Sequence, residues 1–195
     1  MYMNKNIEHY FFHKENFLDA QYCENSINVL NKADWKTHTW YHYGTDTSHV
    51  MTSAEPETLV ALSFSDEVHE INEFIIDNLH SSILEYIESY KFDWFTGWEG
   101  YTEIKFIRYF PGQTMENHCD HVSDMFDGKR RGVPILSIIG ILNDDYEGGN
   151  LIMFKDRKID TKKGDLLLFP SNFLYPHEIT PVTKGVRYSY VSWLW

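Results

Sequence analysis

The segment His118-Cys119-Asp120 contains two side chains that can bind a metal ion, separated by a single residue. In an extended chain, residues i and i+2 project to the same side, so the imidazole and the carboxylate can reach one ion while Cys119 points away. His177 stands much later in the sequence, on another expected strand, and can supply a third ligand. We therefore predict that His118, Asp120 and His177 bind one metal ion and form a catalytic centre.

The donor set narrows the choice of metal. Two histidines and one carboxylate occupy one face of an octahedron and leave three positions open, which is the arrangement of non-haem Fe(II) oxygenases. The same ligands also hold catalytic zinc, so a zinc hydrolase is an alternative. His121 is an alternative to His118 as a ligand, but a residue next to Asp120 in a strand faces the opposite side.

Arg187 and Ser189 repeat the i, i+2 spacing on the last expected strand. They place a fixed cation and a hydroxyl on one side of that strand. A guanidinium can bind a carboxylate through two parallel hydrogen bonds, so the pair suits a ligand that carries a carboxylate. The alternative is a structural ion pair at the surface, which any fold can contain.

Several further segments occur in a fixed order around these residues. They are Arg108-Tyr109-Phe110-Pro111-Gly112 before the metal motif, Leu142-Asn143 and Gly148-Gly149-Asn150-Leu151 after it, Lys163-Gly164-Asp165-Leu166-Leu167-Leu168-Phe169-Pro170 before His177, and Pro181-Val182, Gly185 and Trp193 behind it. In this order and spacing, residues 100–195 resemble the Fe(II)- and 2-oxoglutarate-dependent oxygenases, and within them the prolyl 4-hydroxylase-like branch. A lone His-x-Asp motif is weak evidence, but the ordered set is specific.

This resemblance implies a double-stranded β-helix in which the three predicted ligands bind iron. It also implies that Arg187 binds the far carboxylate of 2-oxoglutarate, with Ser189 beside it, and that Tyr109 forms a hydrogen bond to the same cosubstrate. The implied cofactor and cosubstrates are Fe(II), 2-oxoglutarate and O2, with ascorbate as an optional addition. The implied reaction of this dioxygenase is hydroxylation of a C–H bond, with release of succinate and CO2.

Members of this branch mostly act on peptides or proteins, so the resemblance favours a prolyl residue of a peptide or protein partner as the substrate. The net charge favours neutral or basic peptides, over which segment 123–131 is expected to close. A free amino acid or another small molecule, and a catalytically idle metal-binding jelly roll, are alternatives. Two positions depart from the family pattern: Arg187 stands where collagen-type enzymes usually have Lys, and Gly140 or Ile141 stands where a second Tyr is common.

The second half of the chain predicts the β framework that these side chains need. Short β-branched and aromatic runs, separated by turn residues, predict strands at 101–109, 115–120, 134–142, 150–154, 165–169, 176–180 and 186–195. We expect one domain over residues 1–195, with a mainly β fold. Its jelly-roll core at 101–195 contains the site and is supported by helices from residues 1–100.

Residues 1–100 are expected to be helical and irregular. Apolar residues recur at helical spacing from Ala20 to Leu30 and again from Val68 onward. The second helix is expected to begin near Ser65 or Asp66, which can cap it, and to end near Tyr90. The stretch 37–58 between the helices is polar and predicts a loop or short edge strands.

The composition excludes some partners. Lys and Arg number 17 and Asp and Glu number 29, which gives a net charge of -12 and opposes binding to nucleic acid or to an acidic membrane. Nucleic-acid dealkylases, which share the His-x-Asp motif, have a second Arg where this chain has Trp193. The apolar run from Ile135 to Leu142 is far short of the roughly 18 residues of a spanning helix. With two cysteines and no secretory signal we expect a cytoplasmic protein, whose oligomeric state the sequence leaves open.

Overall fold

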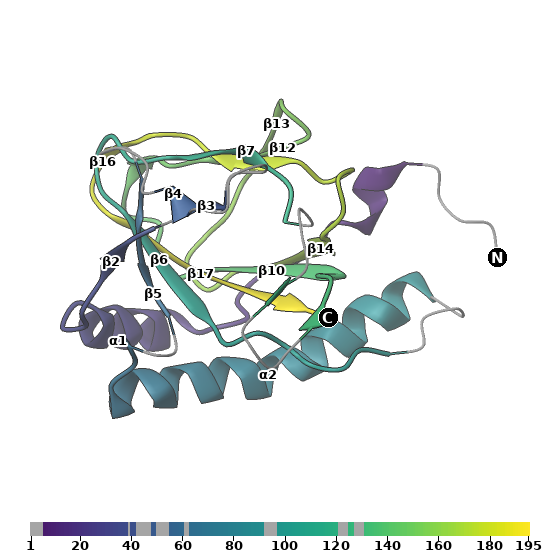
Figure 1. Cartoon of the computed structure of the whole chain (residues 1–195), viewed down its shortest axis with the longest axis horizontal. Coiled ribbons are helices and arrows are strands. Elements are labelled where there is room, and N and C mark those ends of the chain that lie inside the picture. Colours follow the sequence, from purple (N-terminus) through teal and green to yellow (C-terminus); the bar gives the residue numbers. More distant parts are fainter. Residues whose placement is uncertain are drawn as a thin grey trace.

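The computed structural model describes residues 6–38, 40–41, 48–49, 55–60, 63–91, 97–120, 125–126 and 131–195. Within these residues, the strands form two facing antiparallel sheets, and two α-helices lie along the outer side of the larger sheet (Figure 1). The protein is therefore mainly β with a jelly-roll core, as the sequence predicts.

The larger sheet has the order β1-β14-β10-β17-β6-β5-β2. Its central strands are β14 (Leu166–Pro170), β10 (Leu136–Ile141), β17 (Arg187–Leu194) and β6 (Lys105–Tyr109), and its outer strands are β1 (Phe12–Lys14), β5 (Glu57–Leu59) and β2 (Lys36–Thr37). The central strands agree with the predicted ranges to within a few residues. The prediction missed β1, because three residues are too few to show an alternating pattern and the strand is defined by its pairing with β14.

The smaller sheet lies on the other side of the larger sheet from the helices (Figure 1). Its strands, in order, are β13 (Arg157–Ile159), β12 (Leu151–Met153), β15 (His177–Ile179) and β7 (Met115–His118). Three strand pairs complete the described elements: β11 (Glu147–Gly148) with β16 (Val182–Lys184), β3 (Trp40–Tyr41) with β4 (Ser48–His49), and β8 (Met125–Phe126) with β9 (Arg131–Gly132). Strand β7 ends at His118, so Asp120 follows the strand instead of lying within it.

The helices confirm the expected bounds. A short 3-10 helix, η1 (Ile7–Tyr10), precedes α1 (Ala20–Leu30) and α2 (Asp66–Tyr90). The Ser65 side chain accepts a hydrogen bond from the Val68 amide and caps the start of α2. Lys91 follows the last helical residue and adopts a left-handed conformation, with φ 50°, that terminates the helix. In the part of the chain that the structure describes, no helix is both long and apolar enough to cross a membrane.

Alternation along the central strands gives the larger sheet two different faces. On the outer face, Phe106 of β6 and Tyr190 and Leu194 of β17 pack in one buried cluster with the helices. On the opposite face, apolar side chains pack against the smaller sheet in a second cluster. We call this the inner face; its positions are Lys105, Ile107 and Tyr109 on β6, Arg187, Ser189, Val191 and Trp193 on β17, and Ser137, Ile139 and Ile141 on β10.

Candidate metal centre

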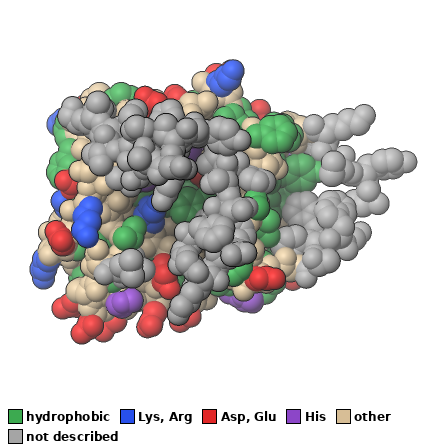
Figure 2. All heavy atoms as spheres, in the orientation of Figure 1, with side chains coloured by type: hydrophobic (Ala, Val, Ile, Leu, Met, Phe, Trp, Pro, Cys, Tyr) green, Lys and Arg blue, Asp and Glu red, His purple; other side chains and the backbone are tan. Residues whose placement is uncertain are grey.

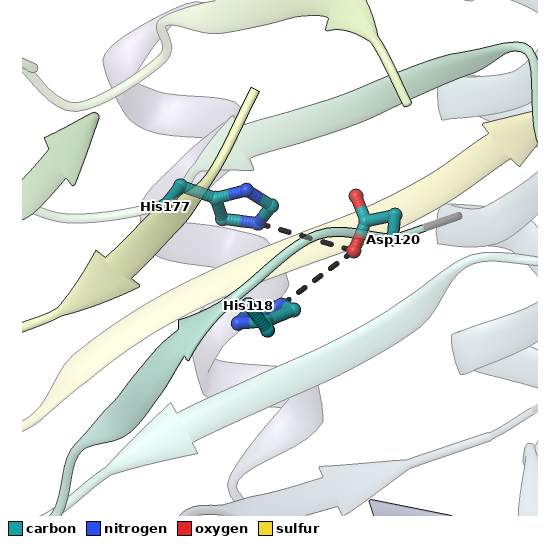
Figure 3. A group of neighbouring side chains, drawn as sticks. All are labelled: His118, Asp120 and His177. Carbon is teal, nitrogen blue, oxygen red and sulfur yellow. Dashed lines mark ion pairs between the residues drawn. The ribbon is translucent and has the colours of Figure 1, made fainter. Parts of the chain in front are cut away.

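His118, Asp120 and His177 come together between the two sheets (Figure 3). His118 ends β7 and His177 begins β15, and the two residues are partners in the antiparallel register of these strands. One carboxylate oxygen of Asp120, Oδ1, lies 3.5 Å from Nε2 of His118 and 3.9 Å from Nε2 of His177. One ligand atom from each residue lies within 4.8 Å of the other two. This spacing allows all three atoms to bind one ion.

Hydrogen bonds fix the orientation of both imidazoles. Nδ1 of His118 lies 2.8 Å from the carbonyl oxygen of Glu116, and Nδ1 of His177 lies 3.2 Å from that of Tyr175. A carbonyl oxygen can only accept, so each Nδ1 carries the proton and donates it. Each Nε2 is then left with a lone pair that faces Asp120, which is the tautomer that a metal ligand requires.

The other oxygen of Asp120 accepts a hydrogen bond from Ser137, which in turn is supported by Ser171. The Ser137 hydroxyl donates to Oδ2 at 2.5 Å, and its oxygen lies 2.9 Å from that of Ser171. Because the single proton of Ser137 goes to Asp120, Ser171 donates to Ser137. Both serines are buried. The arrangement directs Oδ1 toward the two histidines.

The protonation states of the cluster suit a divalent cation. Burial opposes ionisation of Asp120, but the two nearby imidazoles and the hydrogen bond from Ser137 outweigh it and hold the pKa of this carboxyl well below its usual range. Burial lowers the pKa of His177 to about 4, although Asp120 opposes the shift. At neutral pH the cluster therefore offers one carboxylate and a neutral buried imidazole as ligands. This donor set fits Fe(II).

Arg187, Ser189 and Tyr109 form a second cluster on the inner face. Arg187 is 1% exposed and donates from a terminal nitrogen to the Ser189 hydroxyl at 2.7 Å. Its Nε is buried without a hydrogen-bond partner, and no ion pair of Arg187 occurs among the described residues. Its guanidinium carbon lies 5.2 Å from the centre of the Tyr109 ring, and burial raises the pKa of Tyr109 to about 12, so the phenol keeps its proton. A buried cation without an anion fits a ligand carboxylate.

The structure describes some of the remaining predicted positions. His121 and most of segment 123–131 lie outside the described residues. The Cys119 thiol points to the carbonyl oxygen of Phe173 at 3.5 Å and not to the metal cluster. Of the two positions where a second Tyr is common, Gly140 lies beneath the Tyr190 ring on the outer face, and Ile141 faces inward.

Ser137 and Ser171 were not predicted as site residues. Ser137 is a polar residue inside the run from Ile135 to Leu142, at a position that faces inward with Ile139. A lone hydroxyl at such a position needs a partner, which is the signal that could have marked it. Its partner Asp120 lies on another segment, so only the structure identifies the pair.

The fold and the candidate site together resemble those of jelly-roll oxygenases, and sequence comparison finds the same likeness. Residues 104–195 match the family model of the 2OG-Fe(II) oxygenase superfamily. A PKHD-type hydroxylase of Alteromonas mediterranea is 32% identical over 96 residues, which cover 46% of this chain and 41% of the relative. A PKHD-type hydroxylase of Aliarcobacter butzleri is 35% identical over 96 residues, with the same coverage. The chain thus spans about two fifths of the length of the curated relatives it matches.

Solved structures share the fold. A prolyl hydroxylase from Trichoplax adhaerens, in complex with a hypoxia inducible factor oxygen degradation domain peptide fragment, has a TM-score of 0.70 at 18% identity and covers 95% of this chain and 83% of its own. A viral collagen prolyl hydroxylase from Paramecium bursaria Chlorella virus-1 has a TM-score of 0.61 at 18% identity, over 95% and 94% of the two chains. Residues 104–195 are therefore similar to the 2OG-Fe(II) oxygenase superfamily, and the solved structures show that the chain shares the fold of prolyl hydroxylases. The matched family is one whose members use Fe(II), 2-oxoglutarate and O2.

Proposed function

We propose that this protein is an Fe(II)- and 2-oxoglutarate-dependent dioxygenase that hydroxylates a prolyl residue of a peptide or protein and releases succinate and CO2. The observation that carries the proposal is the buried Arg187, which has no anionic partner among the described residues and faces the same interior as the metal-binding cluster. A structural arginine at this depth would be paired with a carboxylate. An arginine without an ion pair among the described residues, in the same interior as three candidate metal ligands, supports a bound anionic cosubstrate.

The residues of the site have separate roles in this proposal. His118, Asp120 and His177 would hold Fe(II), and Arg187 with Ser189 would hold the far carboxylate of 2-oxoglutarate. When bound, these groups and O2 supply the oxidising power that an unactivated C–H bond requires. The Tyr109 phenol, protonated at neutral pH, would donate a hydrogen bond to the cosubstrate. The inner-face isoleucines would exclude water from the reacting groups.

The names of relatives support a prolyl residue of a peptide or protein as the substrate. Curated relatives are PKHD-type hydroxylases, and one structural neighbour is a prolyl hydroxylase in complex with a peptide fragment. Free amino acids, an idle metal-binding module and a zinc hydrolase are the alternatives that experiment must exclude. A cytoplasmic location and the absence of a nucleic-acid partner stay predictions.

The decisive experiment measures succinate formation and the mass of the substrate in the same reaction. The protein is purified without oxygen, loaded with Fe(II), and incubated with 2-oxoglutarate, O2 and proline-containing peptides or free L-proline. We expect succinate formation coupled to a mass gain of about 16 Da, one oxygen atom per turnover, on a peptide. His177→Ala should abolish turnover. Hydroxylation of L-proline alone would reject the peptide substrate, and activity of His177→Ala would reject the metal assignment.

Arg187→Met tests the cosubstrate pocket separately from the metal. This variant should bind Fe(II) like the wild type but lose about 2 to 4 kcal/mol of 2-oxoglutarate binding free energy, because the carboxylate loses its charged partner. Calorimetric titration with both ligands measures the effect. Arg187→Lys, which keeps the charge, should recover part of the affinity. An unchanged affinity in both variants would make Arg187 structural.

A further inference from the structure

The inner face carries a second cation besides Arg187. Lys105 is the first residue of β6 and shares the inner face with Ile107 and Tyr109. Its ammonium nitrogen lies 5.4 Å from the centre of the Trp193 ring, near the end of β17. This contact fixes the direction of an otherwise flexible side chain.

The register of the larger sheet places this ammonium at the metal end of the face. Trp193 is the partner of Ser137 on β10, and Ser137 holds Asp120. The Asp120 carboxylate also stabilises the charge of Lys105, against the burial that lowers the pKa of the lysine. Lys105 is thus beside the metal-binding cluster, on the opposite side of the face from Arg187.

Lys105 lacks an anion of its own. It forms no ion pair and donates no hydrogen bond to a protein atom in the described segments. A Trp ring accepts none of its three N–H groups in the way that an oxygen does. Burial, together with Lys105 and His118, lowers the pKa of the neighbouring His38 to about 3, so His38 is neutral. A divalent ion bound to Asp120 would neutralise this carboxylate, so it would no longer compensate the positive charge of Lys105.

The far carboxylate of 2-oxoglutarate is not the anion that Lys105 lacks. Arg187 and Trp193 are six positions apart on β17, which corresponds to about 20 Å. A five-carbon diacid spans about 7 Å. A carboxylate bound at Arg187 and Ser189 is therefore held toward the other end of β17 from Trp193, over which the ammonium lies. The near carboxylate would be engaged at the metal-binding cluster, which leaves Lys105 for an anion from a different group.

We propose that Lys105 is a specificity-determining residue that binds a carboxylate of the substrate, next to the carbon that is hydroxylated. This inference rests on the proposed function. It differs from the preference for neutral or basic peptides that the net charge favours, because the acidic residues lie elsewhere. Figure 2 shows Asp and Glu side chains gathered along the edge formed by the helices, and seven exposed acidic residues lie on α2: Asp66, Glu67, Glu70, Glu73, Asp77, Glu85 and Glu88.

The test measures the binding of substrate probes to protein loaded with Co(II) and 2-oxoglutarate. The visible spectrum of the bound Co(II) changes when a probe binds beside the metal. The probes are two matched pairs: acetylated peptides with Glu or Gln next to proline, and L-proline or L-prolinamide. In at least one pair, the wild type should bind the carboxylate probe about tenfold more tightly than the amide probe. This difference in affinity is what one charge-assisted hydrogen bond contributes. Lys105→Met should remove this preference, and Lys105→Glu should favour a peptide with Lys at the same position.

Lys158→Met is the matched control, because Lys158 lies on β13 with its side chain 56% exposed; it should keep the wild-type preference. Equal affinities within both pairs, failure of both carboxylate probes to bind, or a preference that survives Lys105→Met would overturn the proposal. A lower 2-oxoglutarate affinity of Lys105→Met without substrate would also overturn it, by placing Lys105 in the cosubstrate pocket. If the wild type fails to bind 2-oxoglutarate, the proposed function itself is wrong.

Discussion

Asp120 is the residue on which the geometry of the centre depends. One of its oxygens faces both histidines, and the other accepts the hydrogen bond from Ser137. Without that bond the carboxylate could rotate and present either oxygen. The buried pair Ser137 and Ser171 therefore orients a candidate metal ligand.

Ser137→Ala should weaken Fe(II) or Co(II) binding about tenfold, because removal of a hydrogen bond to a ligating carboxylate typically costs 10- to 100-fold in metal affinity. Anaerobic calorimetry measures the dissociation constant. Ser171→Ala is the control, since Ser171 contacts Ser137 and not Asp120, and its effect should be smaller. Equal affinities of Ser137→Ala and wild type would show that Asp120 needs no support.

His38 makes stability depend on pH. It is 8% exposed, and its pKa is lowered to about 3 from an ordinary value of 6.5. Between these values the unfolded chain binds more protons than the folded one, so the free energy of unfolding falls as pH decreases. For this residue the loss from pH 7 to pH 5 amounts to about 2 kcal/mol. Urea unfolding of metal-free His38→Gln should show a pH loss smaller by this amount; an identical loss would contradict the assignment.

At the scale of elements, a buried polar side chain of α2 connects this helix to the start of a central strand of the larger sheet. Asn72, buried on the helix, accepts a hydrogen bond from the amide of Ile104 at 3.0 Å and donates to the Glu103 carboxylate at 2.9 Å. These residues lead directly into β6. The helix therefore fixes the start of the strand that carries Lys105 and Tyr109.

Asn72→Ala should lower the free energy of unfolding by about 2 kcal/mol, because it leaves the buried Ile104 amide without an acceptor. Denaturant unfolding followed by circular dichroism measures the change. Asn78→Ala on the same helix is the matched control, since Asn78 is exposed and bonds only to the preceding turn. Its effect should stay below about 0.5 kcal/mol. A similar loss in both variants would indicate a general helix effect.

On the scale of the whole molecule, the core is apolar and independent of the metal. Two buried clusters fill the space on either side of the larger sheet, and the candidate ligands sit at the edge of one of them. A ligand that binds only the folded state adds about 2.7 kcal/mol of stability at one hundred times its dissociation constant. Metal and cosubstrate should thus raise stability without being required for folding.

Thermal unfolding tests this expectation. Redox-inert Ni(II) with 2-oxoglutarate should raise the Tm of the wild type by several degrees, and a chelator should reverse the rise without unfolding the protein. His177→Ala should fold but show no such rise. Unfolding on chelation would instead make the metal a structural component.

The sequence by itself determined what depends on local spacing. The spacing of His118 and Asp120 and the capping signal at Ser65 are local features of the sequence. The structure has α2 and the start of β7 where they were predicted, although β7 ends at His118 and Asp120 follows it. The six predicted site residues lie in two clusters of the same interior.

Only the tertiary structure decided which distant residues meet. The register between β7 and β15 makes His118 and His177 partners, and a shift by one residue would turn one of them to the other face. The support of Asp120 by Ser137 and the position of Lys105 over Trp193 also arise between strands far apart in sequence. Such pairings are set by the packing of two sheets against each other, a property that no single segment contains.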